Sequence, residues 1–243
     1  MINNPFTGAG YVLQGLRLIF RPGLKRYLIV PVTINILVFS LVGWLGFSQF
    51  DGLLDRFMPE SSWLYYFRWI LWPLFAITLI LMIFYTFTII ANLLAAPFNG
   101  KLAEEVERVL TGERPPGAPG SIAADIIPSV LSELRKLVYF LVRALPLLLL
   151  FLIPVVQIGA PFLWILFSAW FLSVEYMDYP MGNHGIKFRD QKTTMKRIRL
   201  TALGFGGGVT LLMLIPILNF LAMPAAVAGA TALWCSQRER LKS

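Results

Sequence analysis

The chain has 243 residues, of which 57% are hydrophobic and 14% are charged, whereas an ordinary soluble domain has about 25% charged residues. A soluble fold of this length cannot cover so much apolar surface, but a lipid solvent removes that need, so we expect one membrane domain over residues 1–243. The net charge is +8, and the basic residues that produce it lie beside apolar blocks. These residues therefore indicate topology signals and contacts with membrane lipid headgroups, and no nucleic-acid partner is expected.

Residues 1–26 precede the first long apolar block. Over 5–21 apolar side chains are mixed with glycines and Arg17, which predicts a short amphipathic segment at the membrane interface. Residues 27–50 hold no charged residue, and a helix of that length covers about 30 Å or slightly more. They are predicted to form the first transmembrane span. Since no small-residue cleavage site is visible, we expect this span to stay in the mature protein.

Residues 69–96 form the second predicted transmembrane span. This apolar block is longer than the minimum for crossing, so tilt or extension beyond the bilayer is expected. Helical spacing of apolar residues continues to about residue 110, which indicates that the same helix extends into the cytoplasm. The Pro/Gly-rich run 111–121 then breaks the chain.

Two further apolar blocks follow, at 137–177 and 200–235. Lys and Arg are scarce in loop 51–68, which carries two bases and three acids, so this loop is placed outside and both termini are placed in the cytoplasm. Each later block then begins and ends on the cytoplasmic side and is predicted to be a helical hairpin. Two full spans with a turn need roughly 44 residues, so partly inserted hairpins fit as well as complete ones.

The predicted fold class is therefore an all-α integral membrane protein. It has two long transmembrane helices, two helical hairpins that are fully or partly inserted, and amphipathic cytoplasmic helices. Helices that are interrupted at membrane depth must face protein or a water-filled cavity, because lipid cannot satisfy freed backbone groups. Ordinary proline kinks in complete spans are the alternative interpretation of the prolines in both hairpins.

Few residues are of the types that form catalytic or metal-binding sites. The single cysteine, Cys235, and the single histidine, His184, are too few for a zinc or haem site or an internal disulfide. No catalytic Ser/His/Asp order or phosphate-binding loop is visible, and the glycine run 204–208 lacks the strand that a dinucleotide site needs. We expect no enzymatic activity, no metal and no cofactor, and we interpret the glycine run as close helix packing or a break. His184, in a loop, is expected to be solvated.

The segment RPGLKRY (21–27) is a candidate anion site. Pro22 suits the first position of a helix, and the next amides would then lack intrahelical acceptors at the positive end of the helix dipole. The candidate anion ligands are Gly23, Leu24, Lys25 and Arg26, with Arg17 and Arg21 as second choice. The alternative is an ordinary positively charged anchor inside the first span.

Polar residues inside or at the edges of the apolar blocks are the second group of candidates. Buried polar groups in lipid are costly and usually point inward. They could line a permeation path or form hydrogen bonds between helices. The candidates for the path are Asn35, Asn92, Asn99, Glu175 and Asn219.

Four stretches carry a family resemblance: QGLRLIFRPGLKRYLIVPVTIN (14–35), NLLAAPFNGKLAEEVE (92–107), EYMDYPMGNHGIKF (175–188) and LIPILNFLAMPAAVAGAT (214–231). In these stretches the chain resembles the CysZ sulfate permease family of bacterial inner membranes, and the resemblance covers nearly the whole length. It implies sulfate uptake into the cytoplasm for sulfur assimilation and cysteine biosynthesis. It also implies two long membrane helices, partly inserted hairpins and a homo-oligomer.

The sulfate-binding motif of that family is Gly-Leu-Arg followed by a second basic residue. In this chain it falls best on Gly23, Leu24, Lys25 and Arg26, where Lys25 replaces the expected Arg. Lys acts as a point charge and cannot bind an oxyanion through two parallel hydrogen bonds, as Arg does. The stretch 15–17 has the literal triplet but lacks the second basic residue.

Three functions are compatible with the sequence. A sulfate channel or transporter comes first, with passive flow or ion coupling open and with Glu104, Glu105 and Glu175 as candidates for proton coupling. The second is a non-transporting scaffold or regulator that binds a cytoplasmic partner through residues 99–136. The third is a lipid-handling protein whose hairpins contact one leaflet.

Overall fold

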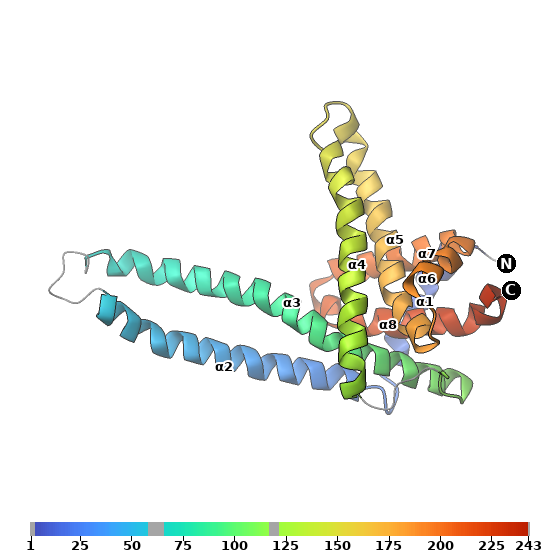
Figure 1. The fold of residues 1–243 in the computed structure, drawn as a ribbon, viewed down its shortest axis with the longest axis horizontal. Coiled ribbons are helices and arrows are strands. Elements are labelled where there is room, and N and C mark those ends of the chain that lie inside the picture. The colour runs from blue at the N-terminus through green and yellow to red at the C-terminus, as the bar shows by residue number, and fades with distance from the viewer. Residues whose placement is uncertain (1–2, 58–65, 117–121, 243) are drawn as a thin grey trace. The chain divides into compact units, whose positions relative to one another are not determined.

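A computed structural model describes residues 3–57, 66–116 and 122–242 (Figure 1). All regular secondary structure in these ranges is helical, which confirms the predicted all-α class for this part of the chain. The elements are α1 (Pro5–Leu18), α2 (Arg26–Phe57), α3 (Arg68–Thr111), α4 (Ile122–Leu150), η2 (Val156–Ile158), α5 (Ala160–Asn183), α6 (Phe188–Arg197), α7 (Arg199–Leu214) and α8 (Pro216–Lys242). The chain divides into two compact units, Ile29–Ala95 and Met1–Leu28 with Ala96–Ser243.

The unit Ile29–Ala95 contains most of α2 and the first part of α3. With 32 and 44 residues, these helices are about 48 and 66 Å long, which exceeds the hydrocarbon core of a bilayer. Within the described residues, α5 alone is long and apolar enough to cross a membrane by itself, and α6 with α7, bent by 104°, qualifies only as a pair. The two complete spans over 27–50 and 69–96 therefore stay predictions.

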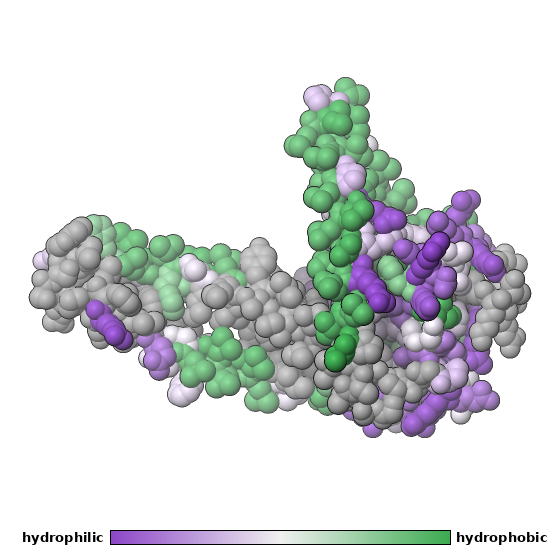
Figure 2. Space-filling model, in the orientation of Figure 1, coloured by the Kyte–Doolittle hydropathy of each residue, from purple (hydrophilic) through white to green (hydrophobic). Residues whose placement is uncertain are grey.

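Helices α4 and α5 lie side by side as a hairpin in the larger unit (Figure 1). The chain turns between Leu150 and Ala160, at the Pro and Gly residues that interrupt the apolar block. Near the middle of the hairpin, the Phe140 ring stacks against Phe167 and meets Phe171 at a tilt, with ring centroids 5.6 and 4.9 Å apart. Toward the turn the side chains are apolar yet exposed (Figure 2), as expected for helices whose solvent is lipid.

Helix α1 packs against α7 and α8 through glycines. Asn4 caps its N-terminus by accepting a hydrogen bond from the Phe6 amide at 2.9 Å. A Cβ at Gly8 would lie 2.6 Å from the Phe205 nitrogen, and one at Gly15 would lie 2.6 Å from the Gly229 nitrogen. Only a residue without a side chain permits this approach between backbones. The interfacial position of residues 1–26 stays a prediction.

Helices α7 and α8 occupy the last apolar block and pack against each other. Within the glycine run, Gly204 faces the backbone of Pro5 and Gly206 faces that of Ala169. The run therefore lies inside a continuous helix and provides close packing, which is one of the two interpretations of the sequence. The buried hydrophobic residues of α8 are mostly alanines, and small side chains let neighbouring helices pack at short distance.

Candidate functional site

The candidate anion segment forms a tight turn. Gly23 has a φ of +88°, and the Leu24 amide donates to the Arg21 carbonyl at 3.1 Å. Pro22 and Gly23 thus occupy the central positions of a type II turn, which needs a positive φ at its second central residue. The expectation that Pro22 opens a helix is wrong: α2 begins at Arg26, because the left-handed Gly23 separates the proline from it.

The turn divides the predicted sulfate ligands into buried and exposed residues. Leu24 is 1% exposed and belongs to the hydrophobic core, so its side chain anchors the turn. Arg17, Arg21 and Lys25 are exposed. The amides of Gly23 and Lys25 have no backbone acceptor among the described residues, whereas the Leu24 amide is already bonded. Two of the three predicted amide donors therefore remain open to an anion.

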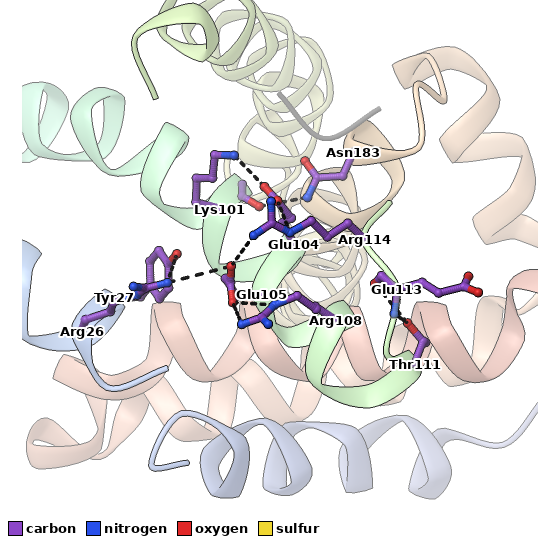
Figure 3. Close-up of polar contacts among 11 residues, drawn as sticks. Arg26, Tyr27, Lys101, Glu104, Glu105, Arg108, Thr111, Glu113, Arg114 and Asn183 are labelled. Atoms are coloured by element: carbon purple, nitrogen blue, oxygen red, sulfur yellow. Dashed lines mark hydrogen bonds and ion pairs between the residues drawn. The ribbon is translucent and has the colours of Figure 1, made fainter. Parts of the chain in front are cut away.

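Arg26 stands at the start of α2 in a polar cluster (Figure 3). Its guanidinium lies 4.9 Å from the centroid of the Tyr27 ring and donates to the Tyr27 hydroxyl at 3.2 Å. A nitrogen of the same group lies 3.9 Å from a carboxylate oxygen of Glu105. The Arg26 side chain is still 61% exposed, so the ion pair orients its charge without removing it from solvent.

Two buried carboxylates of α3 organise this cluster. Glu104 pairs with Lys101 at 2.7 Å, and Glu105 pairs with Arg108 at 2.6 Å. Arg114 reaches both carboxylates, at 3.6 and 3.8 Å. The pKa of Arg108 is raised by its own hydrogen bond with Glu105 and by the negative charge of that carboxylate. Cations outnumber carboxylates in the cluster, so the edge beside the turn has a surplus of positive charge.

The structure describes the side chains of three of the five predicted path residues, Asn99, Glu175 and Asn219. Asn99 is buried and donates to the Tyr179 hydroxyl at 3.3 Å, and Asn219 is exposed on α8. Glu175 is half-buried on α5. Asn35 and Asn92 lie on α2 and α3 but outside the residues whose side chains the structure describes. For Asn99 the interpretation as a hydrogen bond between helices holds.

A buried lysine that the sequence does not single out lies beside Asn99 and Glu175. The Lys136 ammonium contacts Glu133 at 2.7 Å and Asp178 at 3.3 Å, and it lies 4.7 Å from the Tyr179 ring centroid. Burial would lower the pKa of Lys136, but Tyr179, Asp178 and Glu133 outweigh it and the pKa is raised. Lys136 therefore stays charged and joins α4 to α5.

The expectation that His184 is solvated is wrong. Its side chain is 4% exposed, and its Nε2 lies 2.9 and 3.1 Å from the two carboxylate oxygens of Glu107. Arg238 donates to the same carboxylate at 3.0 Å, and the Trp234 ring centroid is 5.3 Å from that of His184. The described residues contain no group of three or more His, Cys, Asp or Glu suited to a metal ion. This buried cluster connects α3, the end of α5 and α8.

Comparison with known proteins addresses the resemblance found in the sequence. A family model described as Sulfate transporter CysZ/Etoposide-induced protein 2.4 matches residues 11–224. The chain belongs to this family. It is 43% identical over 231 residues to a protein of Pseudomonas aeruginosa (strain LESB58) named Sulfate transporter CysZ, covering 94% of each chain. Membership in the CysZ family confirms the resemblance.

Two further relatives named Sulfate transporter CysZ match nearly the whole chain. The protein of Pseudomonas fluorescens (strain Pf0-1) is 43% identical over 235 residues, or 96% of this chain and 94% of the relative. That of Pectobacterium atrosepticum is 40% identical over 240 residues, or 98% and 87%. The matched family region includes the turn at Gly23, the carboxylates of α3 and most of the helices described above.

Proposed function

We propose that this chain transports sulfate across the bacterial inner membrane into the cytoplasm, where sulfate serves sulfur assimilation and cysteine biosynthesis. The observation that carries the proposal is identity of 40–43% over nearly the full length to proteins named Sulfate transporter CysZ. Membership in the CysZ family supports a transporter and not an enzyme. The helical architecture and the exposed apolar helices are compatible with a membrane location.

In the proposed arrangement α2 and α3 cross the membrane completely. The pairs α4–α5 and α7–α8 enter from the cytoplasmic side, and both termini lie in the cytoplasm. The low number of bases in loop 51–68 supports this orientation, because short basic loops stay inside. The exposed apolar faces would contact membrane lipid and other copies of the chain in a homo-oligomer.

The proposed sulfate site is the turn that ends at Arg26. Lys25 supplies an exposed positive charge, the open amides of Gly23 and Lys25 supply donors, and Arg26 supplies a guanidinium held between Tyr27 and Glu105. Charge-assisted hydrogen bonds of this kind are short and strong. The ion pair of Arg26 with Glu105 is long, at 3.9 Å. A sulfate dianion can therefore replace the Glu105 carboxylate as the partner of the guanidinium.

The test is sulfate uptake into liposomes that contain only the purified protein. Hydrogen bonds to charged groups contribute about 1.5–3 kcal/mol each, so the double variant Lys25→Ala/Arg26→Ala should lower uptake by about tenfold or more. The matched control is Arg197→Ala/Arg199→Ala, which removes the same charge from exposed positions elsewhere. The control should transport like the unmodified chain.

Two results would contradict the proposal. Uptake that is absent from liposomes with the unmodified protein would favour the non-transporting scaffold. Uptake that falls equally in the double variant and in its control would show that overall charge matters and that the turn has no special role. Binding of radiolabelled sulfate to the same proteins in detergent separates a loss of affinity from a loss of permeation.

A further inference from the structure

Tyr139 joins three helices of the larger unit. The tyrosine is 8% exposed on α4, and its hydroxyl accepts a hydrogen bond from the Trp170 indole of α5 at 3.0 Å. The Phe188 ring, at the start of α6, meets it edge to face with centroids 5.7 Å apart. This packing fixes the ring, so its face is a rigid surface where α4 and α6 meet.

Two cations lie over this rigid ring. The Arg143 guanidinium is 3.9 Å and the Lys192 ammonium is 4.8 Å from the Tyr139 centroid, and Lys192 is also 4.7 Å from the Phe188 centroid. Aromatic faces attract cations through the ring quadrupole. No carboxylate pairs with either cation in the described part of the chain. Two like charges therefore lie against the same ring.

More positive charge surrounds the pair. Partial burial and the nearby charges of Arg143, Lys196 and Arg189 lower the pKa of Lys192. The segment 187–199 carries six bases and a single acid, the exposed Asp190. Among the described groups that face Lys192, all charges are therefore positive apart from that acid. A bound anion would relieve this repulsion.

The cluster borders an apolar helix face. From 137 to 174 the one charged residue is Arg143. Closer to the hairpin turn, on the same face of α4 as Arg143, lie the exposed Pro146 and the half-buried Leu147 and Leu150. In Figure 2 the hydrophobic surface of this helix adjoins a hydrophilic patch over the region that Figure 1 labels α6. Positive charge at one end of an exposed apolar stripe matches a molecule with an anionic head and an acyl tail.

We propose that Arg143 and Lys192, seated on Tyr139, bind the phosphate of an anionic phospholipid whose acyl chains lie along Pro146, Leu147 and Leu150 of α4. The site rests on the membrane placement of α4 proposed above, and it is separate from the turn at Arg26. Cytoplasmic leaflets are rich in anionic lipid, and basic residues near the surface attract their headgroups. A lipid bound there gives a role to the one basic residue of the apolar block 137–177.

The test is lipid binding to the purified full-length protein in detergent. Short-chain phosphatidylglycerol and phosphatidylcholine are titrated onto delipidated protein, and native mass spectrometry counts the bound molecules. We expect phosphatidylglycerol to bind tightly and phosphatidylcholine weakly. Arg143→Gln and Lys192→Gln should each weaken phosphatidylglycerol binding by about fivefold. Tyr139→Phe, which keeps the ring, should bind like the unmodified protein, and Tyr139→Leu should not.

The matched control is Arg197→Gln/Arg199→Gln, which lowers the charge of the same region equally and should retain phosphatidylglycerol. Equal binding of the two lipids, or unchanged binding when both Arg143 and Lys192 are replaced, would overturn the proposal. Displacement of the lipid by sulfate, beyond that by chloride at equal ionic strength, would show instead a site for free oxyanions. The readout does not involve sulfate uptake, so this site and the transport function can fail independently.

Discussion

Replacement of Gly8 by alanine tests the packing that holds α1. The new Cβ would lie 2.6 Å from the Phe205 nitrogen and nearer still to the Thr201 carbonyl, whereas ordinary contact begins near 3.4 Å. The helices would have to separate by roughly 0.8 Å or more, and such a gap forfeits about a quarter to a half of the dispersion energy at each contact. Overpacking generally costs about 1–3 kcal/mol. Because backbone atoms cannot rotate away, we expect about 3 kcal/mol here.

Thermal unfolding of the purified protein in detergent provides the measurement. For chains of this size about 1 kcal/mol shifts the midpoint by roughly 2–4 °C, so Gly8→Ala should lower it by roughly 6–12 °C. Gly15→Ala should act similarly, since its Cβ would lie 2.6 Å from the Gly229 nitrogen. Gly10→Ala is the matched control in the same helix, because nothing lies within 4 Å of its Cβ. It should leave the midpoint unchanged or raise it slightly, as alanine favours helix.

Equal midpoints for Gly8→Ala and Gly10→Ala would refute this reasoning. They would mean that α1 does not contact α7 and α8 as described. A lower midpoint for Gly10→Ala alone would point to a different buried face of α1, one that includes Gly10. The three variants make the same chemical change in one helix, so differences among them report the surroundings of each glycine.

Three further substitutions test the polar contacts and the turn. Glu107→Ala should destabilise the protein by about 3–5 kcal/mol, measured by thermal unfolding, because it leaves the Arg238 charge without its buried partner. Lys136→Met should cost about as much, since buried carboxylates lose their ammonium, and Lys136→Met/Glu133→Gln should recover part of the loss. Gly23→Ala should cost about 1–2 kcal/mol through its positive φ alone, and it should lower sulfate uptake by displacing the turn.

The positions of many helices could be predicted from the sequence because hydrophobic blocks and their breaks are local signals. The apolar block 137–177 and its internal prolines and glycine indicated a hairpin, and the structure has a turn between Leu150 and Ala160. The continuation of α3 past residue 96 also followed from apolar spacing, and the helix ends at Thr111. Periodicity and Pro/Gly punctuation act over a few residues, so a single sequence contains them.

Contacts between distant residues left no such signal. His184 and Glu107 are 77 residues apart and Arg238 is 131 residues from Glu107, so nothing in the spacing indicated that they meet in a buried cluster. The same holds for Lys136, whose partner Asp178 lies on the other helix of the hairpin. Burial of such groups depends on tertiary packing, and a loop position alone suggested exposure for His184.

The turn at Pro22 shows a different kind of error. Proline suits both the first position of a helix and the first central position of a type II turn. The glycine that follows decides between them, since only the turn requires a positive φ there. The pair Pro-Gly was therefore a usable signal in the sequence. The corrected geometry keeps the amides of Gly23 and Lys25 open and removes that of Leu24 from the site.

The two proposed anion sites differ in how their positive charge is balanced. Beside the turn, Glu105 and Glu104 neutralise part of the charge of the surrounding cations. An anion bound there competes with carboxylates and is held weakly, and transport requires that the ion can leave as well as enter. The cations over Tyr139 have no carboxylate partner among the described residues. An anion bound there meets no such competitor, which suits a resident lipid and not a transported ion.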